Sequence, residues 1–263
     1  MLFINIPLVL LALLILSDLY LKYSPRSDLV LIPIDYKIKK KDNLNEIRID
    51  FKIVNKSKFK ETMVSNLNLE LDFFKSKGNE YFKNMDYEED IYIYNGSRKE
   101  NIKNYWPTTI IKSNSETFIQ VIIKFNNSDF RNKIKYIWLK VFWENYGHFG
   151  ITNKKDCFLV NLDSKKHKTK EVIEVPINND YDALAIRTDI LGCFDEPLDT
   201  LINYSKGIVH KNDILTIGES PLAIMQSRYI SPQNLEYSFF SKLLCYFFNP
   251  TSSLATACGM QLL

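Results

Sequence analysis

The stretch Ile47–Ser57, which reads IRIDFKIVNKS, alternates apolar and charged residues with a period of two. Its apolar members are Ile47, Ile49, Phe51 and Ile53, and its charged members are Arg48, Asp50 and Lys52. Because successive side chains of a strand point to opposite faces, this alternation predicts a strand with one buried face. The polar Asn-Lys-Ser at its end predicts a turn.

Comparable runs continue to about residue 175. They cover residues 67–73, 91–94, 117–125, 135–143 and 156–162. Six or seven short strands, each with one polar face, predict an antiparallel β-sandwich of immunoglobulin-like size over residues 29–175. The segment Phe51–Ser57 is also similar to the strand-then-Asn pattern of water-stress-type sandwiches.

One of these runs is rich in aromatic residues, namely Tyr136, Trp138, Phe142, Trp143 and Tyr146. Such a group can form a surface on which a ligand stacks. It can equally form the core of a sandwich and pack along its edges. The sequence leaves both interpretations open and favours packing.

The N-terminal stretch Leu2–Leu21, LFINIPLVLLALLILSDLYL, is almost entirely apolar. About 20 such residues in a helix span the ~30 Å core of a bilayer, so we expect a single transmembrane helix over residues 1–23. A cleaved signal peptide is the rival hypothesis, but a basic start and a small-residue cleavage site are missing. Basic residues follow the helix, which predicts a single-pass membrane protein with its soluble part in the cytoplasm.

The composition excludes several protein classes. Apolar content of 46% and charged content of 25% are typical of a folded protein, and a net charge of +3 is too small to indicate nucleic-acid binding. The four cysteines show no CxxC spacing and the three histidines are scattered, which argues against a zinc site. We therefore expect reduced thiols and no metal site.

The pattern changes after a basic linker, Ser164–Lys170. Leu184–Ile186 predicts a short buried strand, and Asp213–Gly218 predicts another that ends in glycine. Between them, Asp195 as N-cap, Pro197 in the first turn and Gly207 as the C′ residue predict a helix. This strand–helix–strand order indicates a partial α/β or α+β domain over residues 180–263.

Two stretches of this region carry a family resemblance: Ile186–Arg228, IRTDILGCFDEPLDTLINYSKGIVHKNDILTIGESPLAIMQSR, and residues 249–261, NPTSSLATACGMQ. They resemble the opening of the coenzyme F-420 gamma-glutamyl ligase family, and more specifically a cyanobacterial, membrane-anchored branch of it. The resemblance implies joining of L-glutamate to a deazaflavin cofactor with GTP and Mg²⁺ or Mn²⁺.

By position, the resemblance assigns nucleotide contacts to two groups of residues: Arg187, Thr188, Asp189, Ile190 and Leu191, and then Gly218, Glu219 and Ser220. The family has two lysines in the second region, whereas this chain has Glu219-Ser220-Pro221-Leu222-Ala223-Ile224. A carboxylate replaces a cation where a phosphate is expected. The family's acidic metal ligands would lie beyond Leu263, so we assign no catalytic residue and no metal ligand here.

Three hypotheses follow. The first is a membrane-anchored, non-catalytic binding or scaffold protein with an incomplete, truncated ligase-like domain, which binds at most a nucleotide-like or deazaflavin-like ligand. The second is a GTP- and metal-dependent gamma-glutamyl ligase whose remaining half is supplied by a protein partner that completes the C-terminal domain. The third is a structural envelope protein that binds a partner through an edge strand.

Overall fold

The fold is taken from a computed structural model of the 263-residue chain. It describes residues 5–23, 27–41, 44–75, 81–82, 86–95, 98–102, 108–125, 134–147, 150–162, 171–176, 182–230, 235 and 237–262. The predicted linker, residues 164–170, lies outside these ranges.

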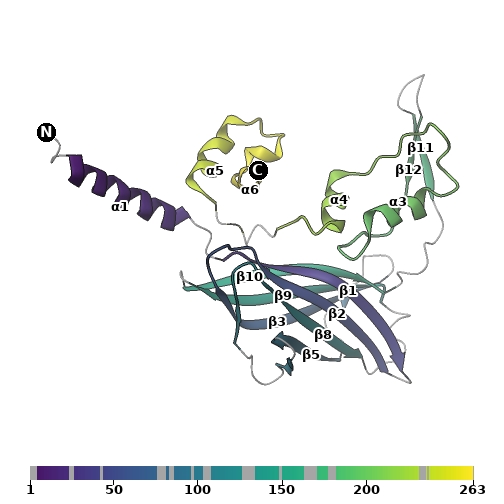
Figure 1. The fold of residues 1–263 in the computed structure, drawn as a ribbon. Helices are drawn as coiled ribbons and strands as arrows, with labels where there is room; N and C mark the ends of the chain where they lie inside the picture. Colours follow the sequence, from purple (N-terminus) through teal and green to yellow (C-terminus); the bar gives the residue numbers. More distant parts are fainter. Residues whose placement is uncertain are drawn as a thin grey trace.

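A β-sandwich occupies the centre of the molecule (Figure 1). One sheet has the order β1-β2-β8-β5-β6, and the other has the order β10-β9-β3-β4 with β7 paired to β3. The first sheet comprises β1 (Leu29–Lys41), β2 (Leu44–Asn55), β8 (Glu116–Phe125), β5 (Tyr87–Asn95) and β6 (Arg98–Asn101). The second comprises β10 (Gly150–Asn161), β9 (Tyr136–Gly147), β3 (Thr62–Phe74), β4 (Tyr81–Phe82) and β7 (Thr109–Ile111). The pairings are antiparallel.

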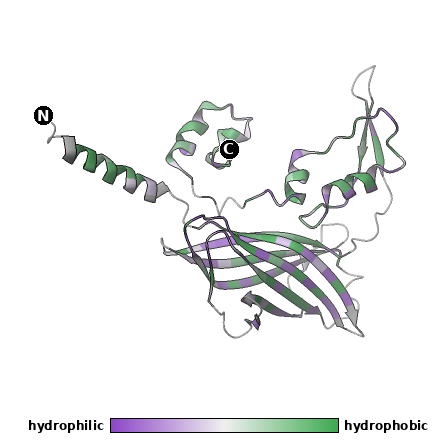
Figure 2. Ribbon diagram, viewed as in Figure 1, coloured by the Kyte–Doolittle hydropathy of each residue, from purple (hydrophilic) through white to green (hydrophobic). Residues whose placement is uncertain are grey.

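The period-two pattern places one face of each long strand in the core. In β2, Ile47, Ile49, Phe51 and Ile53 are at most 1% exposed, and they pack with the inward-facing residues of β3, β8 and β9. Alternating green and purple bands along the strands of Figure 2 show the same pattern. The prediction of an immunoglobulin-like sandwich is confirmed.

The turn after β2 depends on the side chain of Asn55, which is completely buried. Its Nδ2 donates to the carbonyl oxygens of Lys60 (2.8 Å) and Ile111 (3.0 Å), and its Oδ1 accepts from the amide of Ser57 (3.0 Å). These three bonds tie the β2–β3 turn to β7, so the polar residue that ends the strand also closes one end of the sandwich.

The prediction of a transmembrane anchor is wrong. Among the residues that the structure describes, no helix is both long and apolar enough to cross a membrane. Helix α1 (Asn5–Tyr23) has 19 residues, but its unbroken apolar run extends only from Ile6 to Leu16, before Ser17 and Asp18. Eleven residues rise about 16 Å, roughly half of the ~30 Å hydrocarbon core. The predicted single-pass localisation, with a cytoplasmic soluble part, is therefore not supported either.

The C-terminal region consists of a hairpin and short helices (Figure 1). These are β11 (Val172–Pro176), β12 (Asp182–Ile186), α3 (Pro197–Ser205), α4 (Glu219–Met225), α5 (Phe239–Leu244), α6 (Ala257–Gln261) and the 3₁₀ turns η3 (Cys245–Phe247) and η4 (Ser253–Ala255). Strand β11 pairs with β12 in its own two-stranded sheet, so residues 172–175 do not extend the sheets of the sandwich.

The helix predicted from its capping residues is present as α3. Pro197 occupies its first turn, and Gly207 has a positive φ of 78°, as a C′ glycine requires. The N-cap is Glu196, whose carboxylate accepts from the amide of Asp199, instead of the neighbouring Asp195.

The two short strands predicted around this helix differ from the structure. Leu184 lies in β12, but the strand is largely exposed. Residues 213–218 form neither strand nor helix, and Ile214 is 90% exposed. A short apolar run adopts strand geometry only when a neighbouring strand pairs with it, and within the described ranges none does.

Candidate functional site

The first group of predicted nucleotide-contacting residues follows β12. Arg187 opens the group, and its Nη1 lies 2.7 Å from Oε2 of Glu171 at the exposed end of the hairpin. Its amide also donates to the Glu171 carbonyl oxygen (2.9 Å). Thr188 and Ile190 are exposed and Leu191 is half-buried. The guanidinium is therefore already paired with a carboxylate of the same chain.

Asp189 faces the sandwich. Its Oδ1 accepts from Nζ of Lys135 at 2.6 Å and, more weakly, from the hydroxyl of Tyr136 at 3.5 Å. The hydroxyl of Tyr204, on α3, accepts from the Asp189 amide at 3.0 Å and lies 3.4 Å from Oδ2. The carboxylate thus joins the end of the sandwich to helix α3.

The second predicted group lies at the start of α4. Gly218 is its N-cap residue, and Glu219 and Ser220 form its first turn, where both are exposed. No hydrogen bond or ion pair among the described residues connects this group to Arg187–Leu191. The structure therefore places the two groups on separate elements.

These residues do not fit a nucleotide phosphate. Arg187 is the only cation among the eight and forms an exposed surface pair with Glu171, while Glu219 adds a negative charge. Phosphate recognition needs cations or free amide donors directed at the oxygens. In the part of the chain that the structure describes, no three His, Cys, Asp or Glu residues lie close enough together to hold a metal ion.

Next to Asp189, a tight turn lies against β10. The amide of Gly192 donates to Oδ2 of Asp195 (2.7 Å), and the Asp195 amide donates to the Gly192 carbonyl oxygen (3.1 Å). A Cβ atom at Gly192 would lie 3.2 Å from the carbonyl oxygen of Leu159. A side chain at this position would require the turn or β10 to shift by a few tenths of an ångström.

Two further contacts join the region after β12 to the sandwich. The ring of Phe194 meets Tyr36 of β1 edge-on, with 5.0 Å between ring centroids, and both rings pack against the sandwich core. The hydroxyl of Tyr229 donates to the carbonyl oxygen of Cys157 on β10 (2.7 Å). The sequence carries no pattern that marks these residues, because their role depends on which edge of the sandwich the later segment reaches.

Burial shifts the pKa values of several side chains in this region. Burial raises the pKa of the Cys193 thiol to about 12 and also raises the pKa of Tyr229 and of Tyr204. Burial lowers the pKa of Lys135, but hydrogen bonds to Asp189 and Tyr136 outweigh it, so the net shift is upward. The thiol is neutral and the amine charged near pH 7, which suits packing and ion pairing instead of nucleophilic attack.

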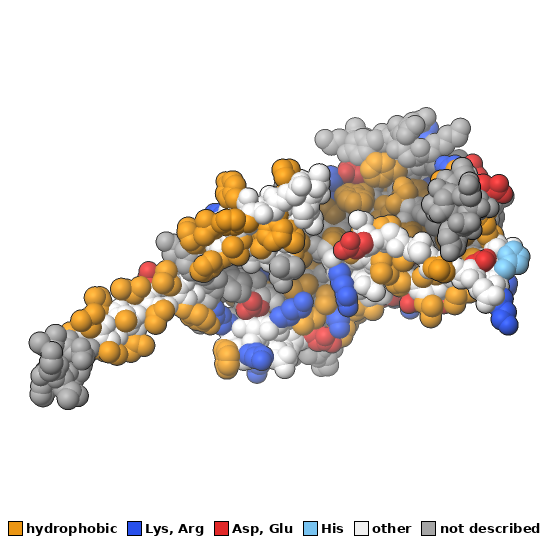
Figure 3. Space-filling view, turned by 90° about the horizontal axis from the view of Figure 1, so that it is seen from above, with side chains coloured by type: hydrophobic (Ala, Val, Ile, Leu, Met, Phe, Trp, Pro, Cys, Tyr) orange, Lys and Arg blue, Asp and Glu red, His pale blue; other side chains and the backbone are white. Residues whose placement is uncertain are grey.

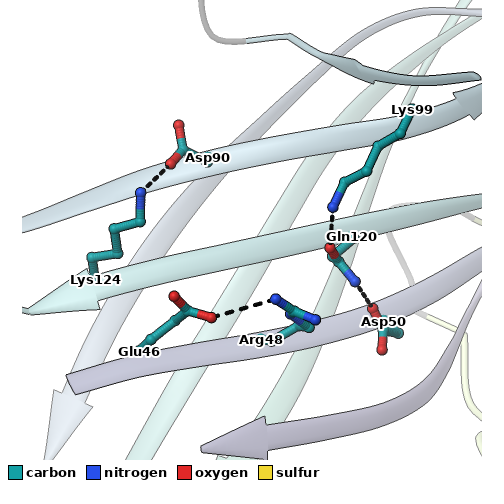
Figure 4. Close-up of polar contacts among 7 residues, drawn as sticks. All are labelled: Glu46, Arg48, Asp50, Asp90, Lys99, Gln120 and Lys124. Atoms are coloured by element: carbon teal, nitrogen blue, oxygen red, sulfur yellow. Dashed lines mark hydrogen bonds and ion pairs between the residues drawn. The ribbon is translucent and has the colours of Figure 1, made fainter. Parts of the chain in front are cut away.

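A second polar cluster covers the outer face of the first sheet (Figure 4). Lys99 Nζ donates to Gln120 Oε1 (2.7 Å), Gln120 Nε2 donates to Asp50 Oδ1 (2.6 Å), and Lys124 Nζ donates to Asp90 Oδ2 (2.7 Å). The hydrogen bond and charge of Asp90 outweigh burial and raise the pKa of Lys124. Cations and carboxylates alternate across the strands, so the cluster holds the sheet together and resembles no catalytic arrangement.

Among the aromatic residues of β9, Trp143 faces the core, whereas Tyr136, Trp138 and Tyr146 lie on the opposite face of the strand. Trp143 and Tyr136 are buried, whereas Trp138 and Tyr146 are exposed. Lys155 Nζ lies 5.1 Å from the centroid of the Phe142 ring, which it partly covers. Packing therefore accounts for Trp143 and Tyr136, and the exposed pair is not brought together with another candidate group.

The chain was compared with known proteins. The sequence model of the family described as F420-0:gamma-glutamyl ligase, N-terminal Ig-like domain, matches residues 30–164, the part that forms the sandwich. None of the curated proteins matches the chain.

Several solved structures share a distant likeness. The putative ApaA protein from Bordetella pertussis is 7% identical with a TM-score of 0.32, covering 53% of this chain and 97% of that one. The ASH/PapD-like domain of human CEP192 is 7% identical with a TM-score of 0.32, covering 52% and 87%. The GAE domain of GGA2p from Saccharomyces cerevisiae is 12% identical with a TM-score of 0.27, covering 50% and 97%. Scores this low add nothing about function.

Proposed function

The chain belongs to the family of the N-terminal Ig-like domain of F420-0:gamma-glutamyl ligase, and on this premise we propose that it is a non-catalytic scaffold. Its sandwich holds the ligase-like segment, residues 182–262, in a fixed position. The segment offers apolar surfaces to a further polypeptide.

The observation that carries this proposal is the exposed apolar surface of the C-terminal helices. Large hydrophobic side chains are exposed on α3, α5 and η3, among them Leu198, Ile202, Phe239, Phe240, Tyr246 and Phe247. Figure 3 shows hydrophobic side chains gathered over the C-terminal helices as well as over α1. Monomeric domains bury such clusters, and large exposed apolar patches mark interaction sites.

The charges of the candidate site support the non-catalytic part of the proposal. Arg187 is paired with Glu171, Asp189 is paired with Lys135, and Glu219 repels a phosphate. Transfer of a phosphoryl group from GTP requires positive groups or metal ions around the transferred oxygens. GTP, Mg²⁺ and Mn²⁺ are therefore not used by the chain in this proposal, and a deazaflavin-like molecule is at most a bound ligand.

The test is a nucleotide assay on the purified full chain. GTP with Mg²⁺ or Mn²⁺ is titrated by calorimetry, and GDP release is followed in the presence of L-glutamate and F420-0. We expect no binding heat and no glutamate-dependent GDP. A complete member of the family serves as the positive control. Glutamate-dependent GDP release by this chain alone would refute the scaffold role.

A second candidate follows from the same apolar surface: a glutamyl ligase that becomes active when another polypeptide covers α3, α5 and η3. The same GDP assay distinguishes it. Activity that appears only after a second polypeptide is added supports this candidate, and it leaves the sandwich in its positioning role.

A further inference from the structure

We infer that the corner of the sandwich formed by β1, β9 and β10 is a docking surface for residues 189–194, and that the ion pair between Lys135 and Asp189 is the latch that keeps this segment seated. Asp189 is thereby a positioning residue for the ligase-like segment. This inference stands apart from the scaffold proposal, since the latch can exist whether or not the chain is catalytic.

The ion pair is short and partly shielded from water. Its N–O distance is 2.6 Å, and the side chains of Lys135 and Asp189 are 17% and 31% exposed. A pair of this kind contributes more than a solvated surface pair, because water screens it less. Loss of either partner also leaves the other charge without its neutralising group.

The backbone fixes Lys135 before the pair forms. The Lys135 amide donates to the carbonyl oxygen of Phe74 at the end of β3 (2.9 Å), and the Leu162 amide donates to the Lys135 carbonyl oxygen (2.8 Å). The lysine is therefore held at the point where two strands of the second sheet end. A cation on a fixed backbone loses little conformational entropy when it binds a carboxylate.

The rest of the segment fits the same corner by shape. Gly192 lies so close to Leu159 that a Cβ atom would be 3.2 Å from its carbonyl oxygen, and Phe194 packs on Tyr36 of the opposite sheet. Tyr36 itself donates from its hydroxyl to the carbonyl oxygen of Asn161 (2.7 Å). The docked segment therefore contacts both sheets. A surface loop that does not pack on the sandwich would not make contacts to both.

Helix α3 is connected to the latch through Tyr204. This side chain is buried, and its hydroxyl bonds both the amide and the carboxylate of Asp189. Release of Asp189 from Lys135 would therefore also remove the link from α3 through Tyr204 and Asp189 to Lys135. A ligand that takes Asp189 as a partner has to compete with the sandwich, so ligand binding and docking are coupled.

Hydrogen–deuterium exchange of the full chain tests the latch. Lys135→Met and Asp189→Asn each remove one charge, and we expect exchange of amides 188–195 to rise about tenfold or more. The charge swap Lys135→Glu with Asp189→Lys should restore exchange to within about threefold of the wild type, because only an ion pair tolerates exchange of its partners.

Lys112→Met is the matched control, because Lys112 is exposed in a loop remote in sequence from the docked segment. Amides 47–53 of β2 report whether the sandwich itself stays folded. Unchanged exchange of 188–195 in both single variants would overturn the inference, as would a swap that restores nothing.

If a variant unfolds the sandwich, the salt dependence of hydrogen–deuterium exchange in the wild-type chain tests the latch instead. Exchange of 188–195 should rise between about 0.05 and 1 M NaCl, over which the screening length falls from well above 10 Å to about 3 Å. Exchange that is insensitive to salt would overturn the latch.

Discussion

Trp143 donates its indole Nε1 hydrogen to Oδ2 of Asp156 across 2.7 Å on neighbouring strands β9 and β10. Trp143 is 2% exposed. Lys154, on the same strand as Asp156, has its Nζ 5.4 Å from the Trp143 ring centroid and donates to the carbonyl oxygen of Leu29 at 2.5 Å. A half-buried carboxylate thus lies beside the Trp143 ring on β10, the edge strand of its sheet.

The first prediction concerns the pH dependence of stability. Burial raises the pKa of Asp156, although the Trp143 hydrogen bond and the charge of Lys154 lower it. The folded protein therefore binds this proton more tightly than the unfolded chain, whose aspartates titrate near about 3.9. The Asp156 contribution to stability is present below that value and decreases as pH rises through the folded pKa.

Asp156→Asn removes this titration and keeps an oxygen that accepts from Trp143. The free energy of unfolding of the variant, relative to that of the wild type, should therefore increase between about pH 4 and pH 7. Urea unfolding at several pH values measures it. A constant difference across this range would show that Asp156 titrates alike in the folded and unfolded states.

The second prediction is that Asn55→Ala destabilises the sandwich by about 2 kcal/mol or more. The substitution leaves the carbonyl oxygens of Lys60 and Ile111 and the amide of Ser57 without the partners they have in Asn55. Asn68→Ala, at an exposed position on β3, is the control and should stay within about 0.5 kcal/mol. Equal midpoints in denaturant for the two variants would contradict the role of Asn55.

The third prediction concerns the docked turn. In Gly192→Ala the new methyl would lie 3.2 Å from the Leu159 carbonyl oxygen and 3.4 Å from its Cβ, so the turn has to move away from β10. We expect the free energy of unfolding to fall by about 1 kcal/mol. We also expect the contact between Tyr36 and the segment that carries Phe194 to weaken, as measured by a change in fluorescence. The substitution Ala183→Gly, at a half-buried position in β12, tests whether any change in this region has the same effect.

The fourth prediction concerns association of the chain. Phe247 is 78% exposed on η3, whereas Phe59 is 90% exposed by itself in a turn of the sandwich. Phe247→Ser should reduce concentration-dependent self-association in light scattering, because it interrupts a contiguous apolar surface. Phe59→Ser removes the same side chain from an isolated position and should change nothing. Similar effects of both variants would argue against a defined surface on the C-terminal helices.

The sandwich could be predicted from sequence because each strand shows the alternation of apolar and polar residues within its own sequence. The alternation around Phe51 determines which side chains are buried, and the polar residues after Val54 determine the turn. Helix α3 could be predicted for a similar reason, since Pro197 and Gly207 act within one or two residues of the helix ends.

Elements that depend on distant partners could not be predicted in this way. The apolar run at Ile214 has no neighbouring strand within the described ranges, so its local preference for strand is not realised. In α1 the apolar run ends at Leu16, before Ser17 and Asp18, so the membrane span predicted from the longer stretch Leu2–Leu21 is wrong. The contact between Lys135 and Asp189 joins residues 54 positions apart, and periodicity carries no information on such a pair.

The contact between Tyr36 and Phe194 has a consequence for synthesis of the chain. Domains fold from the N-terminus as they leave the ribosome, at about 5–20 residues per second. The last strand of the sandwich ends at Asn161, and Phe194 is 33 residues further on, so roughly 2 to 7 s of translation separate them. Throughout that interval the edge of β1 and β10 lacks the segment that later covers it. The newly made sandwich therefore exposes this edge to chaperones and to other nascent chains before its own C-terminal segment arrives.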